Sequence, residues 1–233
     1  MPFFGDTESR DERRGPIWAP FAIIRDNVER LVLVNLGWSI QLLPGVLALA
    51  FPELPPWLRI GIGLYSATVM IPGTGTLYAL SLSAARGEHL SIELARDHLR
   101  ELALPSFRAL APLYGVFGVL IWVGVLSRSV LPGLTTMATL AALLLSLCAI
   151  YWGPLLVTDP TLSALSLAAR STRLAWRYPA ETFATSLVCA GAIVIGMVSI
   201  AGLFLIIPVV ITLLHTERYL DLAWREAAIA VRE

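Results

Sequence analysis

The chain has 233 residues, of which 57% are hydrophobic and only 15% are charged. Its mean hydropathy of +0.74 is well above that of a soluble domain of this size and excludes an ordinary water-soluble globular protein. The 17 basic and 17 acidic residues give a net charge of zero, so the overall charge does not favour nucleic acid as a partner.

Apolar stretches of membrane-spanning length follow one another between residues 31 and 216, and the charged residues fall between them. A hydrocarbon core about 30 Å thick needs ~20 apolar residues per helix and leaves no water for unpaired backbone groups. The sequence therefore predicts an all-α protein, a polytopic transmembrane helical bundle. The expected spans are 31–51, 60–85, 109–127, 130–157 and one continuous apolar stretch at 182–214.

Residues 1–30 form a charged tail followed by a segment that mixes apolar and charged side chains. Ile17, Trp18 and Phe21 beside Arg25 and Glu29 predict a helix in the headgroup layer that leads into the first span. We find no short apolar region with a small-residue cleavage site, so we expect no signal peptide.

Uncharged polar side chains occur inside the first two expected spans. Such groups usually hydrogen-bond across helices and hold a bundle together, and this interpretation is preferred. The alternative is a small intramembrane polar cavity where Pro72 and Gly73 interrupt the second helix. Its candidate lining residues are Asn35, Gln41, Pro72, Thr74, Thr76 and Tyr78.

Two amphipathic surface helices are expected on the cytoplasmic side. The first covers 89–104 and ends before Pro105, with Ile92, Ala95, Leu99 and Leu102 on one face. The second follows Pro154, opens with Asp159 as its N-cap and Pro160 as its first residue, and ends before Pro179.

The second surface helix carries a basic stripe. Arg170, Arg173 and Arg177 recur at three- and four-residue spacing, with Trp176 beside them. Topological anchoring is the preferred interpretation of this stripe. Contact with anionic lipid headgroups and docking of a cytoplasmic partner are the alternatives.

The apolar stretch at 182–214 is too long for one ordinary span and barely long enough for two. A tight hairpin near Ser199 to Gly202 gives six spans with both termini cytoplasmic, and a single tilted helix gives five. Six spans are preferred because they leave only Arg59 and Arg128 outside. The cytoplasmic side then holds Arg10, Arg13, Arg14, Arg25, Arg30, Arg86, Arg96, Arg100, Arg108, Arg170, Arg173, Arg177, Arg218, Arg225 and Arg232.

This topology predicts three regions in a multi-pass protein of the cell membrane. Residues 1–30 are the cytoplasmic tail and interfacial helix, 31–216 the transmembrane domain, and 217–233 a cytoplasmic C-terminal tail.

No catalytic constellation is recognisable. Asp159 and His215 lie at span ends, where capping and interfacial contacts explain them better than proton transfer does. Cys148 and Cys189 sit in separate apolar stretches, and the histidines lack metal-binding spacing, so we expect no catalytic residues, metal site or cofactor.

Several short motifs resemble the YesL-like family of bacterial integral membrane proteins. They are Asn35 with Trp38, the run from Pro72 to Ala79, Arg86 with Gly87, and the segment from Arg170 to Pro179. The resemblance implies an accessory role beside a carbohydrate uptake system and implies no catalytic residues.

Two functions are expected as alternatives. The first is a non-catalytic accessory or assembly protein that packs against a larger membrane complex, such as a sugar permease. The second is a small-solute or lipid transporter that works through the proline-interrupted second and fourth helices. Membrane lipids are expected contacts in both cases, nucleic acid is not, and no motif indicates an oligomeric state.

Overall fold

The computed structural model describes residues 19–51, 53–198, 202, 204 and 206–230, and these residues form an all-helical fold without strands. The prediction of an all-α protein is confirmed. The elements are α1 (Ala19–Ile40), α2 (Leu43–Ala50), α3 (Pro56–Ala85), α4 (Ile92–Leu126), the 3₁₀ turn η2 (Ser127–Ser129), α5 (Pro132–Ala149), α6 (Trp152–Thr158), α7 (Ala164–Arg177), α8 (Pro179–Val198) and α10 (Ile207–Ala230).

Within the described residues, four helical segments are long and apolar enough to cross a membrane. They are compatible with a membrane location, whereas the finer prediction of six spans exceeds this number. These segments are Pro56–Ala85, Ile92–Ser129, Pro132–Thr158 and Pro179–Val198.

The first expected span, 31–51, is divided between two helices. The chain leaves α1 after Ile40, turns at Gln41 and Leu42, and starts α2 at Leu43. Pro44 explains the break, because it cannot donate a hydrogen bond to the carbonyl of Ile40 and its ring clashes there. The upstream part of the expected interfacial helix, with Ile17 and Trp18, lies outside the described residues.

Two expected interruptions are absent. The prediction that Pro72 and Gly73 interrupt the second helix is wrong, because α3 continues through them from Pro56 to Ala85. The separation of a surface helix at 89–104 from the third span is also wrong, because α4 is one helix that contains Pro105 and Pro112. It begins at the N-cap Ser91, whose hydroxyl accepts a 3.1 Å hydrogen bond from the N–H of Leu94.

The fourth expected span is interrupted near Pro154. Helix α5 ends at Ala149 and α6 begins at Trp152, so the break falls at Ile150, the residue whose carbonyl Pro154 cannot pair. The predicted start of the next helix at Asp159 is wrong. Asp159 caps the end of α6, and α7 starts at Ala164, where the Ser163 hydroxyl accepts from the N–H of Ser166.

The long apolar stretch at 182–214 contains the end of one helix and the start of another. Helix α8 ends at Val198 and α10 starts at Ile207, and the two helices contact each other. Residues Ser199 and Ile200, in the expected turn, lie outside the described residues. The chain therefore reverses within the stretch.

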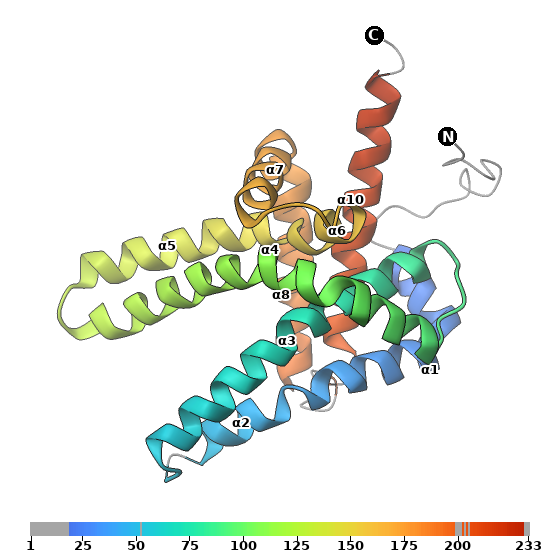
Figure 1. The fold of residues 1–233 in the computed structure, drawn as a ribbon. Coiled ribbons are helices and arrows are strands. Elements are labelled where there is room, and N and C mark those ends of the chain that lie inside the picture. The colour runs from blue at the N-terminus through green and yellow to red at the C-terminus, as the bar shows by residue number, and fades with distance from the viewer. Residues whose placement is uncertain (1–18, 52, 199–201, 203, 205, 231–233) are drawn as a thin grey trace.

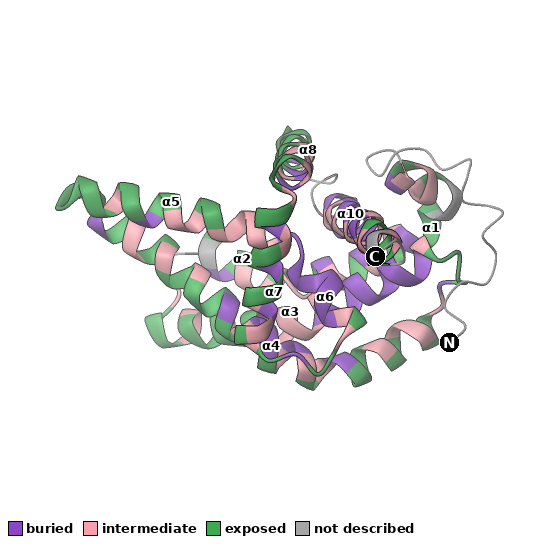
Figure 2. Cartoon of the chain, turned by 90° about the horizontal axis from the view of Figure 1, so that it is seen from above, coloured by how far each residue is buried: buried purple, intermediate pink, exposed green. Residues whose placement is uncertain are grey.

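The buried core lies where α3, α6 and α10 meet, and α1, α4, α7 and α8 pack around it (Figures 1 and 2). Tyr151 and Trp152, at the start of α6, are its largest fully buried side chains. Two helical pairs, α2 with α3 and α4 with α5, extend away from this core as separate arms (Figure 1).

Candidate functional site

Asn35 and Ser39 join α1 to the segment that leads into α10. The Asn35 amide donates to the carbonyl of Phe204 at 2.6 Å and accepts from the N–H of Val209 at 3.1 Å. The Ser39 hydroxyl donates to the same Phe204 carbonyl. Val209 lies in the first turn of α10, where backbone N–H groups have no partner within the helix, so Asn35 satisfies one of them from a neighbouring helix.

The other residues of the expected polar cavity lie along the α1–α3 contact. Thr74 accepts a 3.2 Å hydrogen bond from the indole N–H of Trp38, and Thr76 donates to the carbonyl of Pro72 in its own helix. The Gln41 amide donates to the carbonyl of Gly37, while its buried Oε1 has no hydrogen-bond partner. Most of these polar groups are thus engaged within or between helices.

Tyr78 belongs to a different cluster, which the sequence analysis did not predict. Its hydroxyl lies 2.7 Å from Nδ1 of His215 on α10, and Nε2 of the same ring lies 3.5 Å from Sγ of Cys189 on α8. A neutral imidazole carries one donor and one acceptor, so a single tautomer can satisfy both neighbours. The cluster connects α3, α10 and α8 through the His215 ring.

Three glycines, Gly73 and Gly75 on α3 and Gly153 on α6, allow neighbouring segments to approach closely. A Cβ on Gly153 would overlap the Tyr78 ring, one on Gly73 would overlap Gln41 Oε1, and one on Gly75 would overlap the Ser106 hydroxyl. Absence of a side chain at these positions brings α6, the turn after α1, and α4 against α3. The glycines between Pro72 and Thr76 therefore serve helix packing.

A network of charged groups joins α8 to α10 at one end of the bundle. Arg218 is only 5% exposed, donates to the Thr185 hydroxyl at 2.9 Å and pairs with Asp221 at 3.6 Å. Arg225 pairs with Asp221 at 2.9 Å and with Glu181 at 3.4 Å. A buried guanidinium is costly unless it is paired, and here both a hydroxyl and a carboxylate meet it.

The three arginines of the predicted basic stripe and the neighbouring Trp176 differ in their surroundings. Arg170 pairs with Asp159 at 3.1 Å, and Arg177 pairs with Glu226 at 3.0 Å. Arg173 is exposed and has no ion pair within the described residues. Trp176 is 82% exposed on the same helix, so α7 presents one uncompensated cation beside an exposed aromatic ring.

Asp159 accepts hydrogen bonds from the segment that joins α6 to α7. Its carboxylate accepts from the backbone N–H and the hydroxyl of Thr161. These hydrogen bonds, first that from the hydroxyl, together with the nearby Arg170 guanidinium lower the pKa of Asp159 from its ordinary value. The carboxylate is therefore ionised at neutral pH and keeps its pair with Arg170.

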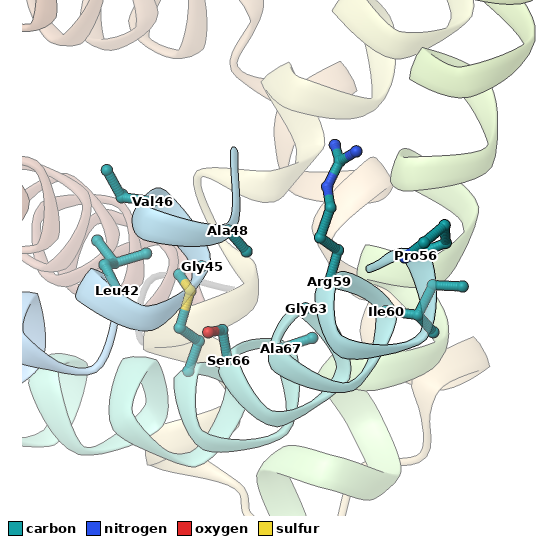
Figure 3. A pocket seen from close by; sticks show the side chains of 11 residues that line it. Leu42, Gly45, Val46, Ala48, Pro56, Arg59, Ile60, Gly63, Ser66 and Ala67 are labelled. Carbon is teal, nitrogen blue, oxygen red and sulfur yellow. The ribbon is translucent and has the colours of Figure 1, made fainter. Parts of the chain in front are cut away.

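A groove of about 580 Å³ lies between α2 and α3, and none of the expected cavity residues is among those that line it (Figure 3). Its lining is mainly apolar and includes Val46 and Ile60, with Arg59 at one end and the buried Ser66 further along α3. The Ser66 hydroxyl has no hydrogen-bond partner.

The sequence analysis missed the His215 cluster, Arg218 and this groove. His215 and Arg218 were placed at a span end and in a tail, whereas α10 continues past both to Ala230. Helical spacing of Thr212, His215 and Arg218 on one face was the available signal. Within the described part of the chain, no group of three or more His, Cys, Asp and Glu side chains could hold a metal ion.

Comparisons with models of protein families, with curated proteins and with solved structures found no match to this chain.

Proposed function

We propose that this protein is a non-catalytic membrane protein that assembles with a larger membrane complex and serves it as an accessory subunit. The observation that carries this proposal is the contrast between a core whose polar groups mostly pair with one another and two apolar arms that project from it. The contacts of the core and the exposure of the arms support it separately.

The core polar groups are largely engaged in holding helices together. Ser81 and Thr212 pair at 2.8 Å, Tyr151 and Thr182 at 2.7 Å, and the Trp152 indole donates to Ser171 at 3.1 Å. A transport pathway needs polar groups that are free to meet a solute. Groups already satisfied by their neighbours favour a supporting role over transport.

The α4–α5 arm offers an apolar surface for a partner helix. Trp122 on α4 is 68% exposed and Met137 on α5 is 70% exposed. Gly124 lies close to Ala138 and Thr139 where the two helices meet, so small residues bring them together and leave the outer faces open. Helices of a partner can pack on these faces by van der Waals contact.

The finer parts of the proposal rest on sequence. Both termini are placed in the cytoplasm by the arginine distribution, and a carbohydrate permease is named as the partner by the YesL-like resemblance alone. Six spans would require α1 with α2, and α10, to cross the bilayer in addition to the four apolar segments.

Site-directed photo-crosslinking in the native membrane tests the assembly. A photoreactive amino acid at Trp122 or at Met137 reports on the arm, and one at Val194, exposed on α8, is the matched control. We expect the arm positions to give one discrete adduct with a membrane protein that co-purifies at fixed stoichiometry in nanodiscs. The control position is expected to give far less of this adduct.

The transporter alternative predicts a different pattern. The protein would be recovered without a partner, the arm and control positions would crosslink alike, and purified protein in liposomes would take up a solute. This combination would overturn the accessory function.

A further inference from the structure

The groove between α2 and α3 has the features of a lipid-binding site. It is long, mainly apolar and open along one side, and its volume of about 580 Å³ falls in the range of small-molecule sites. We infer that it binds one anionic phospholipid, with an acyl chain between α2 and α3 and the headgroup phosphate at Arg59. This inference does not depend on the proposed accessory function.

Arg59 supplies the charge that selects the headgroup. It lies in the first turns of α3, beside the α2–α3 turn, and extends from the helix at the end of the groove (Figure 3). Within the described residues, Arg59 has no ion pair and no side-chain hydrogen bond. A guanidinium at the membrane surface attracts anionic lipid and can bind two phosphate oxygens at once.

The remainder of the groove is shaped for an apolar chain. Gly45 and Gly63 keep it open, and Val46 and Ile60 form its walls. Ser66 lies about 10 Å along the helix axis from Arg59, given 1.5 Å per residue, and contributes the one unpaired hydroxyl of the floor. The groove therefore carries its charge at the Arg59 end and is mainly apolar beyond it, as a phospholipid is.

The lining of the groove suits a lipid chain, because its walls are mainly apolar and its single cation lies at the Arg59 end. A single acyl chain is narrow and flexible enough to follow the contact between two helices.

Native mass spectrometry of the full-length protein tests the site. The protein is released from nanodiscs that contain phosphatidylglycerol and phosphatidylcholine with identical acyl chains in equal amounts. We expect the wild type to retain phosphatidylglycerol preferentially. Arg59→Gln should reduce that preference about fivefold, the effect of one basic side chain at a lipid surface.

Two matched variants separate the groove from general effects. Arg128→Gln removes the same charge from an exposed arginine at the tip of the other arm and should leave the preference unchanged. Gly63→Leu fills the groove and should reduce retention of both lipids. Gly61→Leu, equally unobstructed but outside the groove lining, should not.

Three results would overturn the inference. They are equal retention of the two lipids by the wild type, equal effects of Arg59→Gln and Arg128→Gln, and equal effects of the two leucine variants. A photoreactive residue at Val46 that labels a protein in place of a lipid would likewise reject it. Gel filtration and the melting temperature of each variant establish that it is folded.

Discussion

Asn35 accepts a 3.1 Å hydrogen bond from the backbone N–H of Val209, and this bond fixes the start of α10 against α1. The same side chain donates to the Phe204 carbonyl, and it is completely buried. The Asn35 amide therefore satisfies two backbone groups, the Phe204 carbonyl and the Val209 N–H, where the chain reverses between α8 and α10.

Removal of this amide should destabilise the fold. Asn35→Ala leaves the Val209 N–H without its partner, and interhelical hydrogen bonds in membranes contribute about 0.6 to 2 kcal/mol. We expect a loss of about 1–2 kcal/mol in the free energy of unfolding, measured by denaturation in mixed micelles. Ser39→Ala removes only the second donor to Phe204 and should cost less; an equal or larger loss would contradict the role assigned to Asn35.

Gly153→Ala should be destabilising because its methyl group would overlap the Tyr78 ring. Overpacking of a core costs about 1–3 kcal/mol, and displacement of Tyr78 would also disturb its hydrogen bond to His215. The melting temperature measures the effect. Gly191→Ala, in open space on α8, should be neutral or slightly stabilising because alanine favours a helix. Similar melting temperatures for the two variants would refute the close packing at Gly153.

Arg173→Gln should weaken the contact of α7 with anionic lipid headgroups or with a cytoplasmic partner protein, because Arg173 is the uncompensated cation of the basic stripe. If that contact is with anionic lipid, a spin label at Trp176→Cys, in a background without Cys148 and Cys189, should lie at headgroup depth. Arg173→Gln should then reduce burial of the label, whereas Arg170→Gln, whose charge is already paired with Asp159, should have a smaller effect. A label fully exposed to water in both backgrounds would exclude the lipid contact.

The Asp159–Arg170 pair should show its pH dependence only in acid. The pKa of Asp159 is lower in the folded protein than its ordinary value, so its stabilising contribution is complete above that ordinary value, near 3.8. The contribution is lost as the pH falls through the lowered pKa of the folded state. The melting temperatures of the wild type and Asp159→Asn should therefore differ by a constant amount from pH 7 to about pH 5 and begin to converge only below about pH 4. Convergence near neutral pH would contradict an ionised Asp159.

The prolines show why some helix ends could be predicted and others could not. Pro44 and Pro154 each coincide with a break four residues upstream, whereas Pro72, Pro105 and Pro112 lie inside continuous helices. All five lose the same backbone hydrogen bond, and neighbouring helices and side chains decide whether the helix survives that loss. The sequence shows where a backbone N–H donor is missing, but it does not show which neighbouring groups compensate for the loss.

For the candidate sites, likewise, the sequence identifies polar residues but does not identify their partners. The polar character of Asn35 and Tyr78 within apolar segments is visible in the sequence, and their location inside the bundle follows from it. Their partners, Val209 and His215, lie more than 100 residues away, so they depend on how the helices pack. The α2–α3 groove could not be anticipated because it requires the break at Gln41, which redirects α2 along α3.

The uninterrupted course of α4 links the charged end of this helix directly to the apolar α4–α5 arm. Its 35 residues measure about 52 Å at 1.5 Å per residue, which exceeds a hydrocarbon core of about 30 Å. No loop separates the charged first turns of α4 from the apolar turns that pack on α5. Ala109 and Leu110, midway along the helix, are completely enclosed by the core, so the α4–α5 arm is fixed to the core by the same helix that carries the charged end.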